Sequence, residues 1–245
     1  MRKLLAITDV THMWSDIVCI AGLTEDLQCI RPVTEGGVRI WSLYKSKAPV
    51  IFPSSKIWID LSPAQVAPPH TEDQNFDPVS IEFKDSFETH HWEKLLLLSS
   101  FGSVQHIFDG RLVDRQVAPG TKTRSLGTIK DVKVTNLHAD LRYDRVGWRL
   151  DFQDESGEQH NNFPVNDLAF RGLARNLHDS GLSLDDVADR LYERISQSEK
   201  VYLRVGLARP TAVGKYGEAC WAQVTGVYTF PDYLNGRIWS DFDNR

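Results

Sequence analysis

The chain has 245 residues, of which 41% are hydrophobic and 25% charged, and its formal net charge is −5. This composition is typical of a folded globular protein and excludes a disordered or fibrous one. Because 33 acidic residues outnumber 28 basic ones, the chain as a whole does not attract nucleic acid by its charge. A nucleic-acid site would therefore need a local group of basic residues.

The sequence contains few signals for membrane insertion, secretion or disulfide formation. No apolar stretch approaches the ~18–20 residues that a membrane span needs. The N-terminus begins like a signal peptide, but Thr8 and Asp9 interrupt the apolar run, and we expect a strand there instead. Three cysteines are too few for a disulfide framework, and we expect a reduced, cytoplasmic protein in which Cys19 and Cys29 could face each other across a hairpin.

The first half of the chain alternates short apolar stretches with turn residues, which predicts strands. These strands are Lys3–Thr8, Asp16–Ala21, Gln28–Val33, Lys56–Leu61 and Ser80–Phe83. A helix over His90–Ser99 follows, with Thr89 as its cap. The stretch from Val113 to Leu126 has no apolar period and contains Pro119-Gly120, which predicts a linker. We therefore divide the chain into a first domain at 1–115, a linker at 116–126 and a second domain at 127–245.

The second half also predicts strands, interrupted by helices. The predicted strands are Thr128–Leu137, Val146–Phe152, Lys200–Leu207 and Cys220–Phe230. A helical insertion spans about 165–198, and Ser183 with Asp186 forms a capping box at the start of its second helix. Several short strands with a helix in each half predict two small barrels in tandem.

Several sequence segments resemble those of a known protein family. Arg204–Pro210 and Cys220–Leu234, together with Cys29–Pro32 and Pro68–Asp73, resemble bacterial proteins described as dual OB-containing, over nearly the whole chain. The resemblance implies a mainly β fold with helical insertions (α+β), built from two OB-like small β-barrels in tandem. By analogy with other OB modules it implies binding of nucleic acid or a nucleotide, in a bacterial defence or conflict system, although OB folds also bind sugars and proteins.

The last two predicted strands supply the candidate site. If Val201, Leu203 and Val205 face the core, Tyr202 and Arg204 face outward. On the partner strand Trp221 and Gln223 alternate with apolar residues. Aromatic rings stack on bases while arginine contacts phosphate, which suits a single-strand platform. The loop between the strands adds basic residues, so the predicted nucleic-acid-binding residues are Tyr202, Arg204, Arg209, Lys215, Trp221 and Gln223.

Other interpretations of these residues stay open. Tyr202 and Arg204 could instead cover a second core, and burial of Arg204 against Asp232 or Asp167 would make the motif structural. An accessory subunit of an effector complex could use aromatic anchors, namely Trp14, Trp41, Tyr44 and Trp92. A metal-dependent nuclease could be assembled from Asp9, Asp16, Lys56, His70 and Glu72.

Catalysis and cofactors have little support in the sequence. The Walker, Gly-x-Ser-x-Gly, His-Glu-x-x-His and Gly-x-Gly-x-x-Gly patterns are missing from the chain. The adjacent His90 and His91 should point to different sides, so we expect no metal site and no cofactor. Arg31 could meet an anion or pair with Asp16, and pairing within the fold is favoured, while the basic residues Lys122, Arg124, Arg142, Arg145 and Arg149 are expected to be surface charge. We expect a non-catalytic protein that binds single-stranded nucleic acid or a nucleotide through its second barrel.

Overall fold

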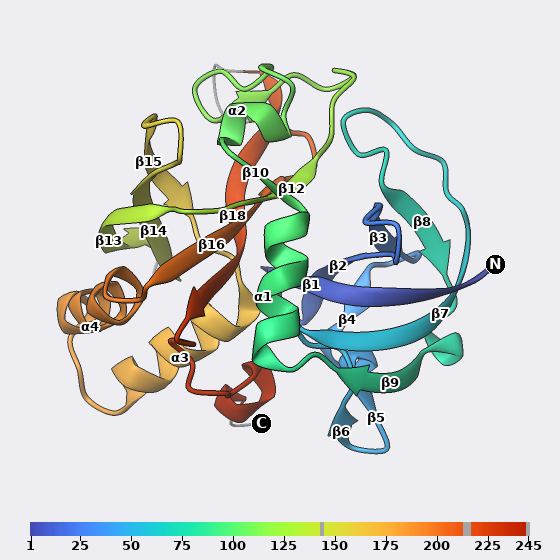
Figure 1. Ribbon diagram of the computed structural model, residues 1–245, viewed down its shortest axis with the longest axis horizontal. Coiled ribbons are helices and arrows are strands. Elements are labelled where there is room, and N and C mark those ends of the chain that lie inside the picture. The colour runs from blue at the N-terminus through green and yellow to red at the C-terminus, as the bar shows by residue number, and fades with distance from the viewer. Residues whose placement is uncertain (143–144, 213–216, 244–245) are drawn as a thin grey trace.

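The computed structural model describes residues 1–142, 145–212 and 217–243 (Figure 1). Strands hold 45% of the described residues and helices 21%, and the strands form a closed barrel and a curled half-barrel. The predicted fold class, mainly β with helices and two barrel-like units in tandem, is therefore confirmed. No helix in the described part of the chain is long and apolar enough to cross a membrane.

The first half closes into a five-stranded barrel. Its strands are β1 (Arg2–Trp14), β2 (Ile17–Leu23), β3 (Cys29–Val33), β7 (Ser55–Pro63) and β8 (Asp73–Phe76). They pair in the order β1-β2-β3-β8-β7, and β7 pairs back with β1 to close the ring. The β3–β8 pair is parallel and the others are antiparallel. This closed barrel is compatible with an OB-like barrel.

Smaller elements complete the first half. They are β4 (Val38–Arg39), β5 (Tyr44–Lys45), β6 (Ala48–Pro49), β9 (Glu82–Ser86) and the 3-10 turns Ile40–Leu43 and Pro78–Ser80. The predicted strand at Ser80–Phe83 appears two residues later as β9, because Asp77 caps the turn at Pro78–Ser80. Cys19 lies opposite Thr11 and Cys29 opposite Leu23, so the two free thiols do not face each other.

The second half curls into a half-barrel. Its central sheet contains β10 (Ser100–Phe101), β11 (Gln116–Val117), β12 (Leu126–Ile129), β16 (Lys200–Leu207), β17 (Thr211–Ala212) and β18 (Glu218–Phe230). A second sheet contains β13 (Lys133–Arg142), β14 (Arg145–Gln153) and β15 (Gln159–Pro164). A parallel bridge between Val165 and Val224 joins the two sheets. Apolar side chains from both sheets fill one core, which includes Phe152, Phe163 and Leu203.

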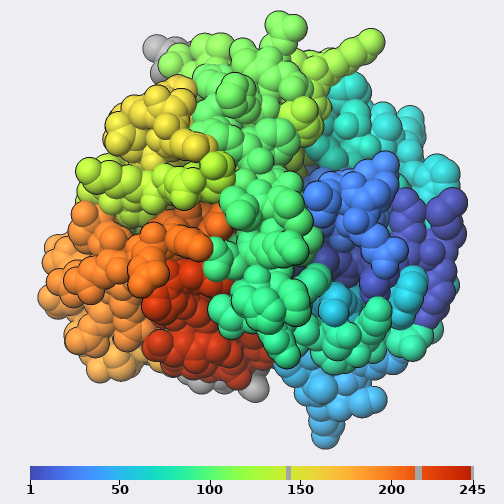
Figure 2. All heavy atoms as spheres, viewed as in Figure 1, coloured from blue at the N-terminus to red at the C-terminus, as the bar shows by residue number. Residues whose placement is uncertain are grey.

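Helices cover the half-barrel and the junction between the halves. They are α1 (Thr89–Leu98), α2 (Val104–Ile107), α3 (Leu168–Asp179) and α4 (Leu184–Ser196), with a 3-10 turn at Trp239–Phe242. The predicted capping box of Ser183 and Asp186 is confirmed at the start of α4. Helix α1 lies between the two halves, and its residues fill the middle of the face in Figure 2. Its buried Trp92 and Leu96 pack against Tyr202, Tyr228 and Phe230.

Both faces of β16 are buried. Val201, Leu203 and Val205 face the half-barrel core as predicted. Tyr202 and Arg204, predicted to face outward, are 3% and 1% exposed. That prediction is wrong because α1 and the first barrel cover the second face of the strand.

The division of the chain at 116–126 stays a prediction. Within this segment β11 pairs with β18 of the half-barrel. Side chains ahead of the segment, including Val104 and Phe108, also join the half-barrel core. The packing of the second half therefore begins before the predicted linker.

Candidate functional site

Arg204 forms a buried ion pair between the two halves. Its Nε and Nη2 lie 2.9 and 2.8 Å from Asp9 Oδ2, and Nη1 donates to Thr128 Oγ1 at 3.1 Å. Thr225 donates to the other Asp9 oxygen. A guanidinium held in this way is not presented to a ligand in solvent, so its placement favours the structural interpretation, with Asp9 as the partner in place of Asp232 or Asp167.

A second polar network joins the halves around Arg31. Its Nη1 lies 3.3 Å from Asp73 Oδ1, and its Nη2 donates to Ser125 Oγ at 2.6 Å. Glu72 accepts from the Ser125 backbone N–H at 2.7 Å and from its hydroxyl at 2.9 Å. Arg31 therefore pairs within the fold, as favoured, but Asp16 is not its partner, because Asp16 pairs with Arg39 at 2.6 Å.

His70 belongs to the same network as a neutral group. Its Nδ1 accepts from Arg31 Nη1 at 3.2 Å, which leaves its proton on Nε2. Burial, together with the charges of Arg31 and Arg209, lowers the pKa of His70 to about 4. An unfolded histidine titrates near 6.5, so the unfolded chain binds more protons and the folded state loses stability as the pH falls from about 6.5 to about 4.

Replacing His70 by glutamine should remove this acid sensitivity. The loss of unfolding free energy between about pH 7 and 4.5 should be about 2 kcal/mol smaller in His70→Gln than in the natural chain. The buried Asp167, whose pKa is raised to about 6 by desolvation, contributes with the opposite sign but is present in both proteins. Urea unfolding followed by tryptophan fluorescence measures the difference, and equal pH dependence of the two proteins would contradict it.

The nuclease candidates do not meet in one site. Asp9 is held by Arg204 and Asp16 by Arg39. Lys56 pairs with Asp85 at 2.5 Å, on a different part of the barrel from the Arg31 network. His70 and Glu72 do share that network, in which His70 Nδ1 contacts Arg31 and Glu72 accepts from Ser125.

A cleft of about 510 Å³ opens beside the Arg31 network. Residues of β1, β2 and β3 of the first barrel line one part of it. Residues of the first half line it, including Met13, Trp14, Cys19, Arg31 and Pro32, with Arg209, Gln223 and Asn166 opposite. The Trp14 side chain is 59% exposed, at the end of β1. We call this space the Trp14 cleft.

Two residues predicted from the sequence reach the Trp14 cleft. Arg209 pairs with Asp73 Oδ2 through Nη1 at 2.7 Å, while its side chain stays 42% exposed. Asn166 donates to Gln223 Oε1 at 2.6 Å, which orients the Gln223 amide so that its Nε2 is the group available to a ligand. The cleft therefore offers hydrogen-bond donors beside an exposed indole ring.

Trp221 lines a second cavity of about 530 Å³. Its other described lining residues are Arg115, His138, Ala139, Asp140, Arg149, Asn162, Pro164 and Ala222. The indole N–H of Trp221 is buried and meets no acceptor in the described part of the chain. Trp221 and Gln223 lie two residues apart on one face of β18, so this Trp221 cavity and the Trp14 cleft follow each other along that face.

The two cavities differ in charge from the protein as a whole. Among the described residues that line them are four arginines, Arg31, Arg115, Arg149 and Arg209, and a single acidic residue, Asp140. Asp140 pairs with Arg149 at 2.8 Å. Asp73 pairs with both Arg31 and Arg209, and Arg31 is buried, so Arg115, Arg149 and Arg209 are the arginines of these cavities whose side chains are partly exposed.

The residues of the predicted nucleic-acid site therefore do not lie together in the structure. Trp221, Gln223 and Arg209 line the two cavities, Tyr202 and Arg204 are buried, and Lys215 lies outside the described residues. Trp14 and Arg31 line the cleft but were not predicted as nucleic-acid ligands. Of the other proposed aromatic anchors, Trp41 is exposed, Tyr44 packs edge-on against Trp239 and Trp92 is buried.

One cluster with metal-ligand chemistry is structural. Asp154, Glu158 and His160 bring potential ligand atoms together. The buried Asp154 carboxylate, however, accepts from the backbone N–H groups of Val104 and Ser156, from the Ser156 hydroxyl and from His160 Nε2. These four hydrogen bonds connect the β14–β15 turn to α2. The Asp154 carboxylate therefore has a structural role.

Comparison with known proteins adds no family. No protein-family model matches the chain. No curated protein matches it either. The barrel and half-barrel are compatible with the OB-like architecture that the resemblance implied, and function has to be argued from the geometry of the β18 face.

Proposed function

We propose that the protein binds single-stranded nucleic acid, or a nucleotide, in the Trp14 cleft and the adjoining Trp221 cavity. The observation that carries this proposal is that two tryptophans and three partly exposed arginines, Arg115, Arg149 and Arg209, line two adjoining cavities of an otherwise acidic chain. The site lies between the two halves, whereas the sequence predicted a platform on the second barrel alone.

The chemistry of the lining residues suits an unpaired strand. Base–aromatic stacking contributes ~1–3 kcal/mol per base and tolerates any base, and the exposed Trp14 ring offers such a surface. Arginines beside the rings can meet the phosphates that connect stacked bases. Each cavity also lies within the ~300–1,000 Å³ typical of small-molecule sites, which is why a nucleotide stays an alternative ligand.

Fluorescence anisotropy with labelled single-stranded DNA and RNA of about 12 nucleotides tests the proposal. We expect a Kd below about 10 µM at low salt that weakens as salt is added, because bound cations on the nucleic acid are released on binding. Double-stranded DNA of the same length should bind more weakly, since its bases are not available for stacking. Absence of binding to both single strands at low salt would overturn the proposal.

Arg209 should contribute directly to affinity. Arg209→Ala is expected to weaken single-strand binding about fivefold to 30-fold, because a charge-assisted hydrogen bond contributes ~1–2 kcal/mol, and to reduce the salt slope by about 1. Asp73 keeps Arg31 as a partner in this variant, so the fold should persist.

Arg2→Ala is the matched control for Arg209→Ala. Arg2 is also ion-paired, with Asp60 and Glu82, and its side chain is 44% exposed, but it lies at the start of β1, away from both cavities. Equal loss of affinity in the two variants would show that general surface charge, and not the Trp14 cleft, determines binding.

A further inference from the structure

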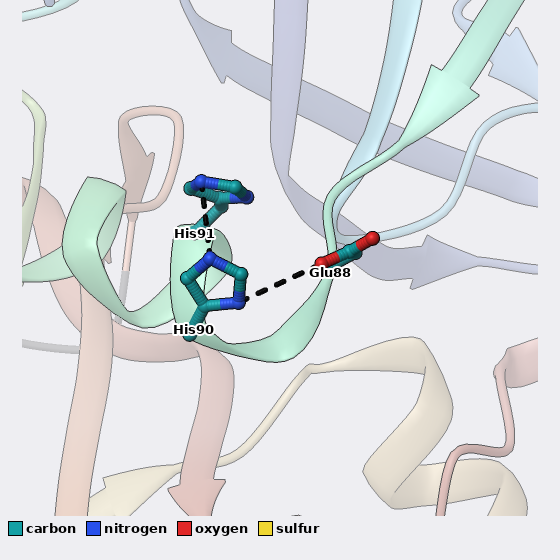
Figure 3. Close-up of side chains that lie close together, drawn as sticks. All are labelled: Glu88, His90 and His91. Atoms are coloured by element: carbon teal, nitrogen blue, oxygen red, sulfur yellow. Dashed lines mark hydrogen bonds and ion pairs between the residues drawn. The ribbon is translucent and has the colours of Figure 1, made fainter.

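Three side chains with metal-binding groups gather at the start of α1, outside the β18 face (Figure 3). His90 Nε2 lies 3.1 Å from His91 Nε2, and the two rings are 3.7 Å apart at an angle of 41°. Glu88 Oε2 lies 3.7 Å from His90 Nδ1. The prediction that the adjacent histidines point to different sides is therefore wrong.

This convergence is not imposed by the helix. Neighbouring residues on an α-helix are rotated by about 100°, which directs their side chains apart. Glu88 occupies the N-cap position, yet its carboxylate makes no capping hydrogen bond to the helix. It is turned toward Nδ1 of His90 instead, while His91 lies at Nε2 of the same ring, so the carboxylate can hold the imidazole whose other nitrogen faces His91.

We propose that His90 and His91 bind one divalent transition-metal ion of the zinc, nickel or copper type through their Nε2 atoms, and that Glu88 orients His90 by accepting a hydrogen bond from its Nδ1–H. Metal–nitrogen bonds of ~2.0–2.1 Å in tetrahedral geometry separate two ligand nitrogens by ~3.3 Å, close to the 3.1 Å between the two Nε2 atoms. One ligand atom from each of the three residues lies within 4.8 Å of the others. Imidazole nitrogen is a preferred ligand of this group of metals, and the carboxylate supplies a compensating charge.

The exposure of the three residues defines the kind of site. All three side chains are open to solvent, so the ion keeps coordination positions for water or for a group from another molecule. The Asp154 cluster differs because its carboxylate is buried and its hydrogen-bond capacity is used. Lys56 and Lys94 share a shallow groove with Glu88 and His91 and oppose a cation, so we expect a Kd on the order of 10 µM rather than the tight binding of closed structural sites.

Isothermal titration of the full-length, chelator-treated and untagged protein with ZnCl₂ and NiCl₂ tests the proposal. We expect one ion per chain, and at least tenfold weaker binding in His90→Ala and His91→Ala, with a smaller loss in Glu88→Gln. All three positions are exposed, so circular dichroism should show an unchanged fold. His106→Ala, which removes an exposed histidine on α2, and Glu158→Gln, which alters the other cluster, are the matched controls.

The visible absorption spectrum of bound Co²⁺ gives a second readout that does not rely on calorimetry. A tetrahedral spectrum that disappears in His91→Ala and persists in His106→Ala would support the site. Undetectable binding of Zn²⁺ and Ni²⁺ at 1 mM, or equal affinity in all variants, would overturn it. These outcomes do not depend on nucleic-acid binding, because no residue of this cluster lines the Trp14 cleft or the Trp221 cavity.

Discussion

Replacing Arg204 by methionine is expected to lower the free energy of unfolding by about 3–5 kcal/mol. The substitution leaves the Asp9 carboxylate buried between the two halves without the guanidinium that contacts it at 2.8 Å. A domain is commonly stable by only ~5–15 kcal/mol, so this loss would unfold a substantial fraction of the protein near its working temperature. Urea unfolding, followed by tryptophan fluorescence and circular dichroism, measures it.

Two further variants separate the buried pair from surface charge. Arg39→Met breaks a partly exposed pair with Asp16 and should cost ~1 kcal/mol or less. The double variant Asp9→Asn/Arg204→Met removes both charges, and we expect it to recover at least about 2 kcal/mol relative to Arg204→Met alone. A loss below about 1 kcal/mol in Arg204→Met would show that the halves do not depend on this ion pair.

The local pattern of apolar residues correctly predicted the strands and helices in which these residues recur with a regular period. β16 has the predicted bounds, Lys200–Leu207, and α4 begins after the predicted capping box. β8 was missed because Asp73–Phe76 is largely polar and has no apolar alternation. Its strand conformation depends on pairing with β3 and β7, which closes the barrel, and such pairing is not visible in a short window.

Alternation alone could not show which face of β16 is open. It correctly separated Val201 and Leu203 from Tyr202 and Arg204, but polar and aromatic types do not reveal that a second layer covers them. The partner of Arg204 is Asp9, 195 positions earlier in the chain. A contact over this separation follows from the docking of the two halves, which no local motif encodes.

The candidate site was predictable in part for the same reason. Trp221 and Gln223 lie on the outer face of β18, as their alternation with apolar neighbours indicates. Trp14 and Arg31 come from the first half and reach the cleft only because the halves pack against each other. The tryptophan just before the tight turn between β1 and β2 was visible in the sequence, but its place in the same cleft as Arg209 was not.

The double variant Trp14→Ala/Trp221→Ala should weaken single-strand binding at least about 30-fold, since each ring contributes ~1–3 kcal/mol of stacking. Fluorescence anisotropy at low salt measures the loss. Trp41→Ala is the matched control: its side chain is 69% exposed, but it lines neither cavity. An equal loss in Trp41→Ala would contradict the site. Trp221 is half-buried, so circular dichroism has to show a folded protein in each case.

The two single variants distinguish a strand from a nucleotide. A strand that spans both cavities contacts both rings, so Trp14→Ala and Trp221→Ala should each weaken binding and their free-energy losses should add. A single nucleotide occupies one cavity, so only one substitution should matter and free mononucleotide should compete with the labelled oligonucleotide. Because Trp14 belongs to the first half and Trp221 to the second, additive losses would also show that the bound strand crosses the junction that Asp9 and Arg204 hold together.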